Sequence, residues 1–391
     1  MTPKGFQFSA VKASIKPWNK EDVGLIVSQL PCAAAGVFTT NRVKAAPVLL
    51  DMKHMKGKTH RAILANSGCA NAATGKAGYQ DSLTSAMQVA ELIGCKTDEV
   101  FVASTGVIGV PLPMEKITGA MGRLNAWLDV NPDGFTRAIM TTDTKPKSAS
   151  ATVTIGGKET TVWGCAKGAG MFHPNMATML AFIVTDASVS KTVLKTALKD
   201  ATDRTFNRAT VDGDTSTNDT ALLLANGAAN GRPVKAGTAD YKKFLSALSG
   251  VCASLADQLV LDGEGVTRLG EIFVERAASA KDAVRVARSI AGSLLVKTAL
   301  NGGDPNWGRI VCAAGYSGVR VVPEKMELYF GEHCAFKNGT PTDVAEKTLA
   351  DEFTKKRVVM RLVLNMGKAE ASYLFSDISH EYVSINAHYR T

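Results

Sequence analysis

One stretch of the chain, residues 167–186, restricts what the rest can form. It begins with a loop that is rich in glycine and contains one proline, and from Thr178 onward it continues as a run of Met, Leu, Ala, Phe, Ile and Val. A glycine-rich segment followed by a short apolar run predicts a loop that leads directly into a buried strand. The hydroxyl of Thr178 is therefore expected at the boundary between loop and strand.

A hydroxyl at this boundary becomes a nucleophile only if a base lies beside it. An internal threonine is a weak nucleophile, and His173 is the only nearby side chain that could act as its base. Cleavage of the bond between Ala177 and Thr178 would supply another base, because the new α-amine has a reference pKa of about 8. The same residues also suit an ordinary turn with a β-branched residue at a strand start, so spacing alone leaves both interpretations open.

Length and composition indicate a globular protein with a large core. The 391 residues are enough for two or three domains, and 45% hydrophobic with 21% charged residues is an ordinary balance. No apolar run approaches the roughly 18 to 20 residues of a membrane span, and the first residues do not resemble a signal peptide. We therefore expect a cytoplasmic protein with no membrane partner.

The net charge of +9 raises the question of a nucleic-acid partner. The one dense basic run, residues 53–61, has no interleaved aromatic side chains, so we expect a solvated loop and no nucleic-acid binding. The seven cysteines lack CxxC or CxxxC spacing, and the six histidines are scattered. We therefore expect reduced, mostly buried thiols and no metal site.

Hydrophobic periodicity predicts strands alternating with helices, which supports a mixed α/β class. The C-terminal residues 380–391 look strand-like as well. Strands are expected at 25–30, 36–40, 47–50, 61–66, 100–104, 179–185, 309–313, 326–330 and 357–364, with a hairpin at 151–155 and 160–164. Helices are expected at 79–93, 114–128, 190–205, 238–258 and 281–300.

Several turns carry groups suited to binding. Where a buried strand ends at residues 104–106, the hydroxyl of Thr105 and the unhindered backbone N–H of Gly106 could point at one spot, as an oxyanion hole requires. Glu264 lies between two glycines and could pair with a ligand amine or simply occupy a turn. Residues 67–75 could present backbone amides to an anion or allow a helix to pack closely, and we favour the structural interpretation.

Five motifs, in the same order along the chain, resemble those of the ornithine acetyltransferase family, the bifunctional glutamate N-acetyltransferases of arginine biosynthesis. In that family the bond before the threonine of the cleavage motif is broken autocatalytically. Two small departures are residues 13–16, which read Ala-Ser-Ile-Lys where Gly-Ile-Lys is expected, and His173, where a small residue is commoner. The motifs are S-T-G-V-I-G from 104, A-I-M-T-T-D from 138, K-G-x-G-M-x-x-P-N-M-A-T-M-L from 167, D-G-E-G from 262 and I-N-A-x-Y-R-T from 385.

The resemblance implies roles for individual residues. Thr178 is implied as the nucleophile, exposed by cleavage after Ala177, with Thr105 and Gly106 forming the oxyanion hole. The polar run at 211–220 also occurs in the family, where it looks structural or pocket-flanking, and we assign it no catalytic role. Substrate binding is implied for Thr141, for Lys167 through the substrate α-carboxylate, for Thr178, for Glu264 through the side-chain ammonium of ornithine, and for Asn386 and Thr391.

The resemblance also implies a fold and an assembly. The expected fold is a two-sheet α-β-β-α sandwich with helices on both outer faces. Self-cleavage would divide it into an α chain of residues 1–177 and a β chain of residues 178–391. The two chains are expected to remain together and to pair into an α2β2 heterotetramer.

The implied reaction is a double displacement through acetyl-Thr178, from N2-acetylornithine to glutamate, releasing ornithine and needing no bound cofactor. Whether acetyl-CoA also serves as a donor stays open. Two other functions also stay open. One is a self-processing amidohydrolase or aminopeptidase with an N-terminal threonine, and the other is an uncleaved binding protein.

Overall fold

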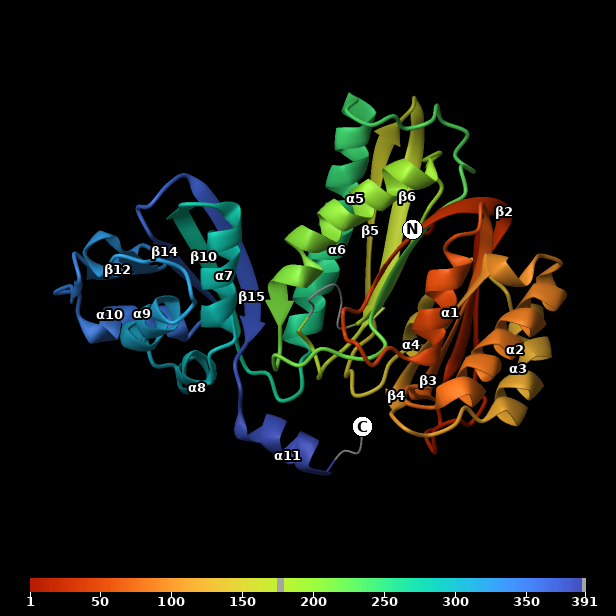
Figure 1. Ribbon diagram of the computed structural model, residues 1–391, viewed down its shortest axis with the longest axis horizontal. Helices are drawn as coiled ribbons and strands as arrows, with labels where there is room; N and C mark the ends of the chain where they lie inside the picture. The colour runs from red at the N-terminus through yellow and green to blue at the C-terminus, as the bar shows by residue number, and fades with distance from the viewer. Residues whose placement is uncertain (174–178, 389–391) are drawn as a thin grey trace.

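The computed structural model describes residues 1–173 and 179–388, and this part of the chain forms two lobes (Figure 1). Strand β2 (Val23–Phe38) organises the larger lobe. Its first half, Val23–Val27, pairs with β1 (Phe6–Val11) and β3 (His60–Cys69), and β3 pairs in turn with β4 (Val100–Val107). After a register shift between Val27 and Cys32, its second half pairs with β9 (Thr220–Ala225). One strand therefore belongs to two layers.

The second layer continues from β9 through the strands that flank the cleavage motif. Its order is β2, β9, β7 (Leu180–Thr185), β6 (Lys158–Lys167) and β5 (Lys147–Ile155). Strand β7 is antiparallel to β6 and parallel to β9, and Lys167 pairs with Leu180. The cleavage motif therefore connects two neighbouring strands at one end of this layer.

Apolar side chains fill the space between the two layers and cover both outer faces. Phe8 and Phe101 from the first layer meet Trp163 and Phe182 from the second. Helices α2 (Gly75–Ile93) and α3 (Met114–Ala126) cover the first layer, while α5 (Lys191–Arg204) and α6 (Ala239–Leu261) cover the second. The predicted α-β-β-α sandwich is confirmed for this lobe.

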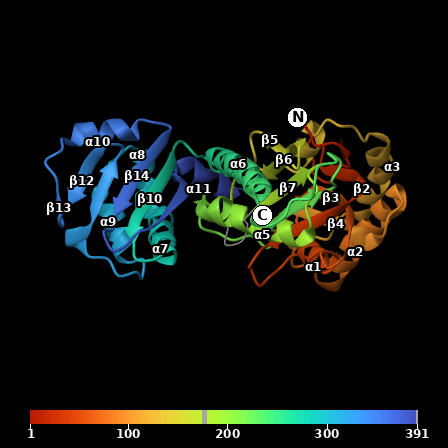
Figure 2. The ribbon, with the colours of Figure 1, turned by 90° about the horizontal axis from the view of Figure 1, so that it is seen from above.

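The smaller lobe was not predicted as a separate unit. It is a seven-stranded sheet in the order β13 (Thr340–Pro341), β12 (His333–Lys337), β11 (Glu327–Phe330), β14 (Arg357–Val363), β10 (Leu269–Ala277), β15 (Ala369–Ser376) and β8 (Ala209–Thr210). Its core also includes residues of α7 (Ala280–Ala291), α8 (Leu294–Gly302), α9 (Trp307–Gly315) and α10 (Glu346–Phe353). Figure 2 shows the lobes side by side, with α6 toward their junction.

Four predicted segments were wrong. Residues 47–50 lie in α1 (Ala46–His54), whose first turn accommodates Pro47. Residues 309–313 lie in α9, because the side chain of Asn306 accepts a hydrogen bond from the N–H of Arg309 and caps that helix. The predicted helix at 281–300 is two helices, since Ser293 caps α8.

The fourth difference concerns the last described residues of the chain. Residues expected to be strand-like form helix α11 (His380–His388). It follows β15 and extends back beneath the larger lobe (Figure 1). Another helix of the larger lobe, α4 (Asp133–Ala138), precedes a loop that also reaches the site.

Helix α6 is long and apolar enough, by length and composition, to cross a membrane. In this fold one face of the helix, which includes Phe244, Leu248 and Leu255, is buried in the core of the larger lobe. Core helices of globular proteins often meet the same criterion.

Candidate active site

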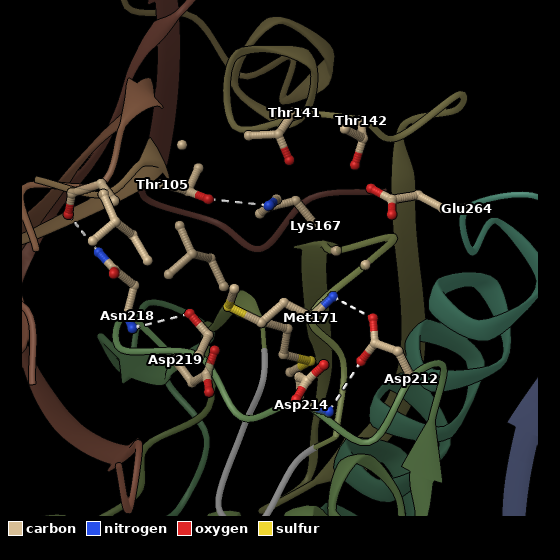
Figure 3. A pocket seen from close by; sticks show the side chains of 18 of the residues that line it. Thr105, Thr141, Thr142, Lys167, Met171, Asp212, Asp214, Asn218, Asp219 and Glu264 are labelled. Carbon is tan, nitrogen blue, oxygen red and sulfur yellow. Dashed lines mark hydrogen bonds between the residues drawn. The ribbon is translucent and has the colours of Figure 1, made fainter. Parts of the chain in front are cut away.

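A pocket of about 280 Å³ brings together six of the residues implicated by the sequence. They come from β4, the loop after α4, the end of β6, the loop after α6 and α11. In Figure 3 the side chains of Thr141 and Glu264 point toward the side where Lys167 contacts Thr105. The six are Thr105, Gly106, Thr141, Lys167, Glu264 and Asn386.

The remaining predicted residues, Ala177, Thr178 and Thr391, lie outside the described residues. The two residues that follow Thr178 in sequence, Met179 and Leu180, line the pocket. Strand β7 begins at Leu180, as expected for a loop that leads directly into a buried strand.

Thr105 and Gly106 lie where β4 runs parallel to β3. Gly106 has a φ of 133°, and a Cβ at this position would lie 2.4 Å from the carbonyl carbon of Gly68. Only glycine fits such a backbone and so close an approach. The ammonium of Lys167 donates a hydrogen bond of 3.0 Å to the hydroxyl of Thr105 (Figure 3). Because an ammonium only donates, Thr105 is the acceptor, and its own proton is available to another acceptor.

Lys167 is a buried cation that faces groups of both signs. Burial lowers the pKa of its ammonium, and Lys147 lowers it further, while Asp143, Asp219 and Glu264 oppose the shift. A buried ammonium that is held in place but not fully neutralised is well suited to bind a carboxylate.

Two hydrogen bonds fix the backbone at Thr141. Its N–H donates a 2.8 Å hydrogen bond to Asp143, and the ammonium of Lys16 donates one of 2.9 Å to the carbonyl of Met140. Burial, followed by the charge of Lys167, lowers the pKa of Lys16 to about 7. The position of Thr141 is therefore set by contacts on both sides of it.

Glu264 and Asn386 form another wall of the pocket. The Asn386 side-chain amide donates a 2.8 Å hydrogen bond to Glu264 Oε2, and the N–H of Glu264 donates one of 2.9 Å to the carbonyl of Ala169. Helix α11 is docked through Ser379, whose hydroxyl donates a 2.6 Å hydrogen bond to the carbonyl of Gly265. The C-terminal segment does reach the site, but as a helix.

The polar run at 211–220 supplies the pocket residues that were given no role. It follows β8, and Asp212 accepts hydrogen bonds of 2.5 and 2.7 Å from the N–H groups of Met171 and Phe172. The Asn218 amide donates to the carbonyls of Ala70 (2.6 Å) and Ser104 (2.8 Å), which ties this run to β4. The run is pocket-flanking, and the density of short polar side chains was the signal for it. Its lining members are Asp212, Asp214, Ser216, Asn218 and Asp219.

His173 packs toward the smaller lobe. Its Nδ1 lies 3.0 Å from the hydroxyl of Thr210 in β8, and its ring stacks on Tyr373 of β15. Burial, with the charges of Arg288 and Lys297, lowers the pKa of the imidazole to about 4. The ring is therefore neutral near pH 7 and anchors this part of the cleavage motif to β8 and β15.

Comparisons with known proteins find relatives along the whole chain. A model described as the ArgJ family matches residues 7–391. The chain is 48% identical to the arginine biosynthesis bifunctional protein ArgJ of Dehalococcoides mccartyi, over 100% of this chain and 96% of that one. It is 49% identical to the protein of the same name from Geobacter sulfurreducens, over the whole of both chains.

A solved structure is similar as well. The crystal structure of the arginine biosynthesis bifunctional protein ArgJ from Bacillus halodurans is 41% identical, with a TM-score of 0.53. The match covers 54% of this chain and 100% of that chain.

Proposed function

The chain belongs to the ArgJ family, and we propose that it transfers an acetyl group from N2-acetylornithine to glutamate in arginine biosynthesis. One observation carries the proposal: a single pocket gathers a hydroxyl, a buried cation and a carboxylate from segments far apart in sequence, beside the residues that follow Thr178. These are the groups that an acyl transfer between two amino acids requires.

The first step is self-cleavage. The hydroxyl of Thr178 attacks the carbonyl carbon of Ala177, the C–N bond breaks, and the resulting ester is hydrolysed by water. The products are chains of 177 and 214 residues, the second of which begins with a free α-amine on Thr178. Met171, in the described part of the connecting segment, has a φ of 50°, a strained conformation for a residue with a Cβ.

Two observations support this division of the chain. The Bacillus halodurans chain is matched in full but covers only 54% of this chain, close to the share of residues 178–391, which are 214 of 391 residues, or about 55%. Strand β7, near the start of the second chain, is paired with β6 of the first. This pairing supports the proposal that the two chains remain associated after cleavage.

Acetyl transfer then proceeds through acetyl-Thr178. The α-amine of Thr178 takes the proton from its own hydroxyl, and the oxygen attacks the acetyl carbonyl of N2-acetylornithine. The Thr105 hydroxyl and the Gly106 N–H stabilise the negative oxygen that forms. The same proton passes to the departing α-nitrogen, and ornithine leaves. The α-amine of glutamate then attacks the acetyl ester and regenerates Thr178.

The pocket charges account for recognition of both amino acids. Donor and acceptor share an α-carboxylate, which binds Lys167, with Thr141 beside it. The δ-ammonium of ornithine pairs with Glu264, which Asn386 holds in place, and Thr391 completes the substrate contacts. The reaction needs no cofactor, and acetyl-CoA is a second donor to be tested. The functional form is a cytoplasmic α2β2 heterotetramer.

Intact mass under denaturing conditions tests the first step. We expect two fragments, the second beginning at Thr178, and one full-length chain for the Thr178→Ala variant. A single uncut wild-type chain would contradict the proposal and would favour an uncleaved binding protein. Acetylglutamate formation without matching release of acetate would separate the transferase from an N-terminal-threonine hydrolase.

A further inference from the structure

Asp143 is a buried residue at which two substrate-binding segments meet. Its Oδ2 accepts a 2.8 Å hydrogen bond from the N–H of Thr141, and its Oδ1 accepts one of 2.8 Å from the N–H of Gly168. Thr141 lies in the loop after α4, and Gly168 follows Lys167 at the end of β6. One carboxylate thus fixes the backbone at or next to two residues, Thr141 and Lys167, that are proposed to bind the substrate.

Lys147 connects Asp143 to a third segment, the loop after α6 that carries Asp262 and Glu264. Its ammonium lies 2.6 Å from Asp143 Oδ1 and 2.5 Å from Asp262 Oδ2, and its side chain is only 2% exposed. Asp262 also accepts hydrogen bonds from the N–H and hydroxyl groups of Thr144. Because Asp262 is two residues before Glu264, the chain of charges reaches the wall that binds the ornithine side chain.

We propose that Asp143, Lys147 and Asp262 form a positioning unit that fixes Thr141, Lys167 and Glu264 relative to one another for substrate binding. The inference rests on the proposed function, because the proposed function is what makes Thr141, Lys167 and Glu264 substrate-binding residues. Buried ion pairs contribute little net stability but specify geometry when every partner is satisfied. None of the three members of the unit lines the pocket, so the unit acts through its neighbours.

The unit also controls charge at Lys167. The titratable groups that act on Lys167 are Asp143, Asp219 and Glu264, which favour its charged form, and Lys147 and Lys16, which oppose it. The Asp143 carboxyl is desolvated, which alone would raise its pKa, but the charges of Lys167 and Lys147 hold that pKa below its usual range. Asp143 is therefore ionised in the folded enzyme near neutral pH. Its negative charge helps to keep Lys167 protonated.

Asparagine is the sharpest replacement at position 143. Both carboxylate oxygens accept hydrogen bonds, so either orientation of an amide would turn its NH2 group toward an N–H or ammonium donor. The change is nearly isosteric and removes one charge. It should shift the three segments without opening a cavity.

The test compares Asp143→Asn and Asp262→Asn with Asp203→Asn. Asp203 pairs with Lys199 at the same i, i+4 spacing as Lys147 and Asp143, but on the exposed face of α5. The readouts are kcat and KM for N2-acetylornithine from about pH 6 to about pH 10, which spans a lowered lysine pKa. We expect Asp143→Asn to raise KM on the order of tenfold or more, with a smaller change in kcat. The alkaline limit of kcat/KM should also move to lower pH, and Asp203→Asn should match the wild type.

The outcomes separate the two proposals. A wild-type enzyme that neither cleaves itself nor transfers acetyl would overturn the proposed function and the positioning unit with it. An active wild type, with an Asp143→Asn variant of unchanged KM and unchanged alkaline limit, would overturn the positioning unit alone. If thermal melting shows that Asp143→Asn does not fold, Asp262→Asn decides, since its side chain is partly exposed, and an unchanged KM there would reject the unit.

Discussion

The backbone of Gly170 lies directly against the carboxylate of Glu264. A Cβ built on Gly170 would lie 2.3 Å from Oε2 and 2.6 Å from the carboxylate carbon. No residue with a side chain fits there unless the Glu264 carboxylate moves. The segment that leads toward Thr178 and the carboxylate proposed to bind ornithine are therefore packed as one surface.

Replacing Gly170 by alanine should weaken binding of the ornithine side chain. The added methyl group would displace Glu264, so we expect the Gly170→Ala variant to raise KM for N2-acetylornithine on the order of tenfold. The KM for glutamate should change less, because the side chain of glutamate has no ammonium to pair with Glu264. Gly250→Ala is the matched control, since a Cβ at Gly250 in α6 meets no atom of the described residues within 4 Å. Equal changes for both substrates would contradict the assignment of Glu264.

Removing the Thr105 hydroxyl should slow the chemical step. An oxyanion donor is worth about 3 to 4 kcal/mol, so Thr105→Ala should lower kcat by on the order of a hundredfold or more. Thr105→Ser keeps the hydroxyl that accepts from Lys167 and should retain most activity. Steady-state kcat for acetylglutamate formation checks both variants, and normal turnover by Thr105→Ala would exclude Thr105 from the oxyanion hole.

The sequence predicted the pocket better than it predicted the contacts that build it. Thr105, Lys167 and Glu264 each lie within three residues of the end of a strand or helix, and such ends are visible as breaks in periodicity. The hydrogen bonds of Asp143 and Asp212 join segments far apart along the chain, and no local pattern encodes them.

The errors in the fold have a similar cause. Short apolar runs such as residues 309–313 suit a buried strand and a buried helix equally, and only the Asn306 cap separates the two. Strand β2 was predicted as two strands, residues 25–30 and 36–40, but in the structure it continues between them, with a register shift between Val27 and Cys32. The apolar pattern alone therefore predicts neither the type of element at 309–313 nor the length of β2.

As pH rises, substrate binding should be lost at a lower pH than it would be if Lys167 had the pKa of an ordinary lysine. Burial lowers the pKa of Lys167, so its charge is lost as pH rises through that lowered value. KM for both N2-acetylornithine and glutamate should then rise together, because we propose that both bind Lys167 through the α-carboxylate. Lys167→Arg should abolish this alkaline rise, since arginine stays protonated. A rise for only one substrate would contradict the shared carboxylate site.

Stability should depend on His173 in mildly acidic solution. The folded pKa of about 4 lies below the ordinary value of 6.5, so between these values the unfolded chain binds a proton that the folded chain does not. Stability is therefore lost as pH falls from about 6.5 toward 4, by about 2 kcal/mol at pH 5. Melting temperatures at pH 7 and pH 5 should differ less for His173→Asn than for the wild type. Equal differences would mean that the imidazole is not held neutral.

The same variant tests whether His173 takes part in self-cleavage. The imidazole contacts Thr210 and Tyr373, and the backbone carbonyl of His173 accepts a 3.1 Å hydrogen bond from the Thr215 hydroxyl. Replacing the ring leaves that backbone contact intact, so His173→Asn should still cleave at Thr178, with a rate within about tenfold of the wild type if only loop anchoring is weakened. The time course of fragment appearance by intact mass measures this rate. A variant that never cleaves, but melts as the wild type does at pH 7, would instead identify His173 as the base that activates Thr178.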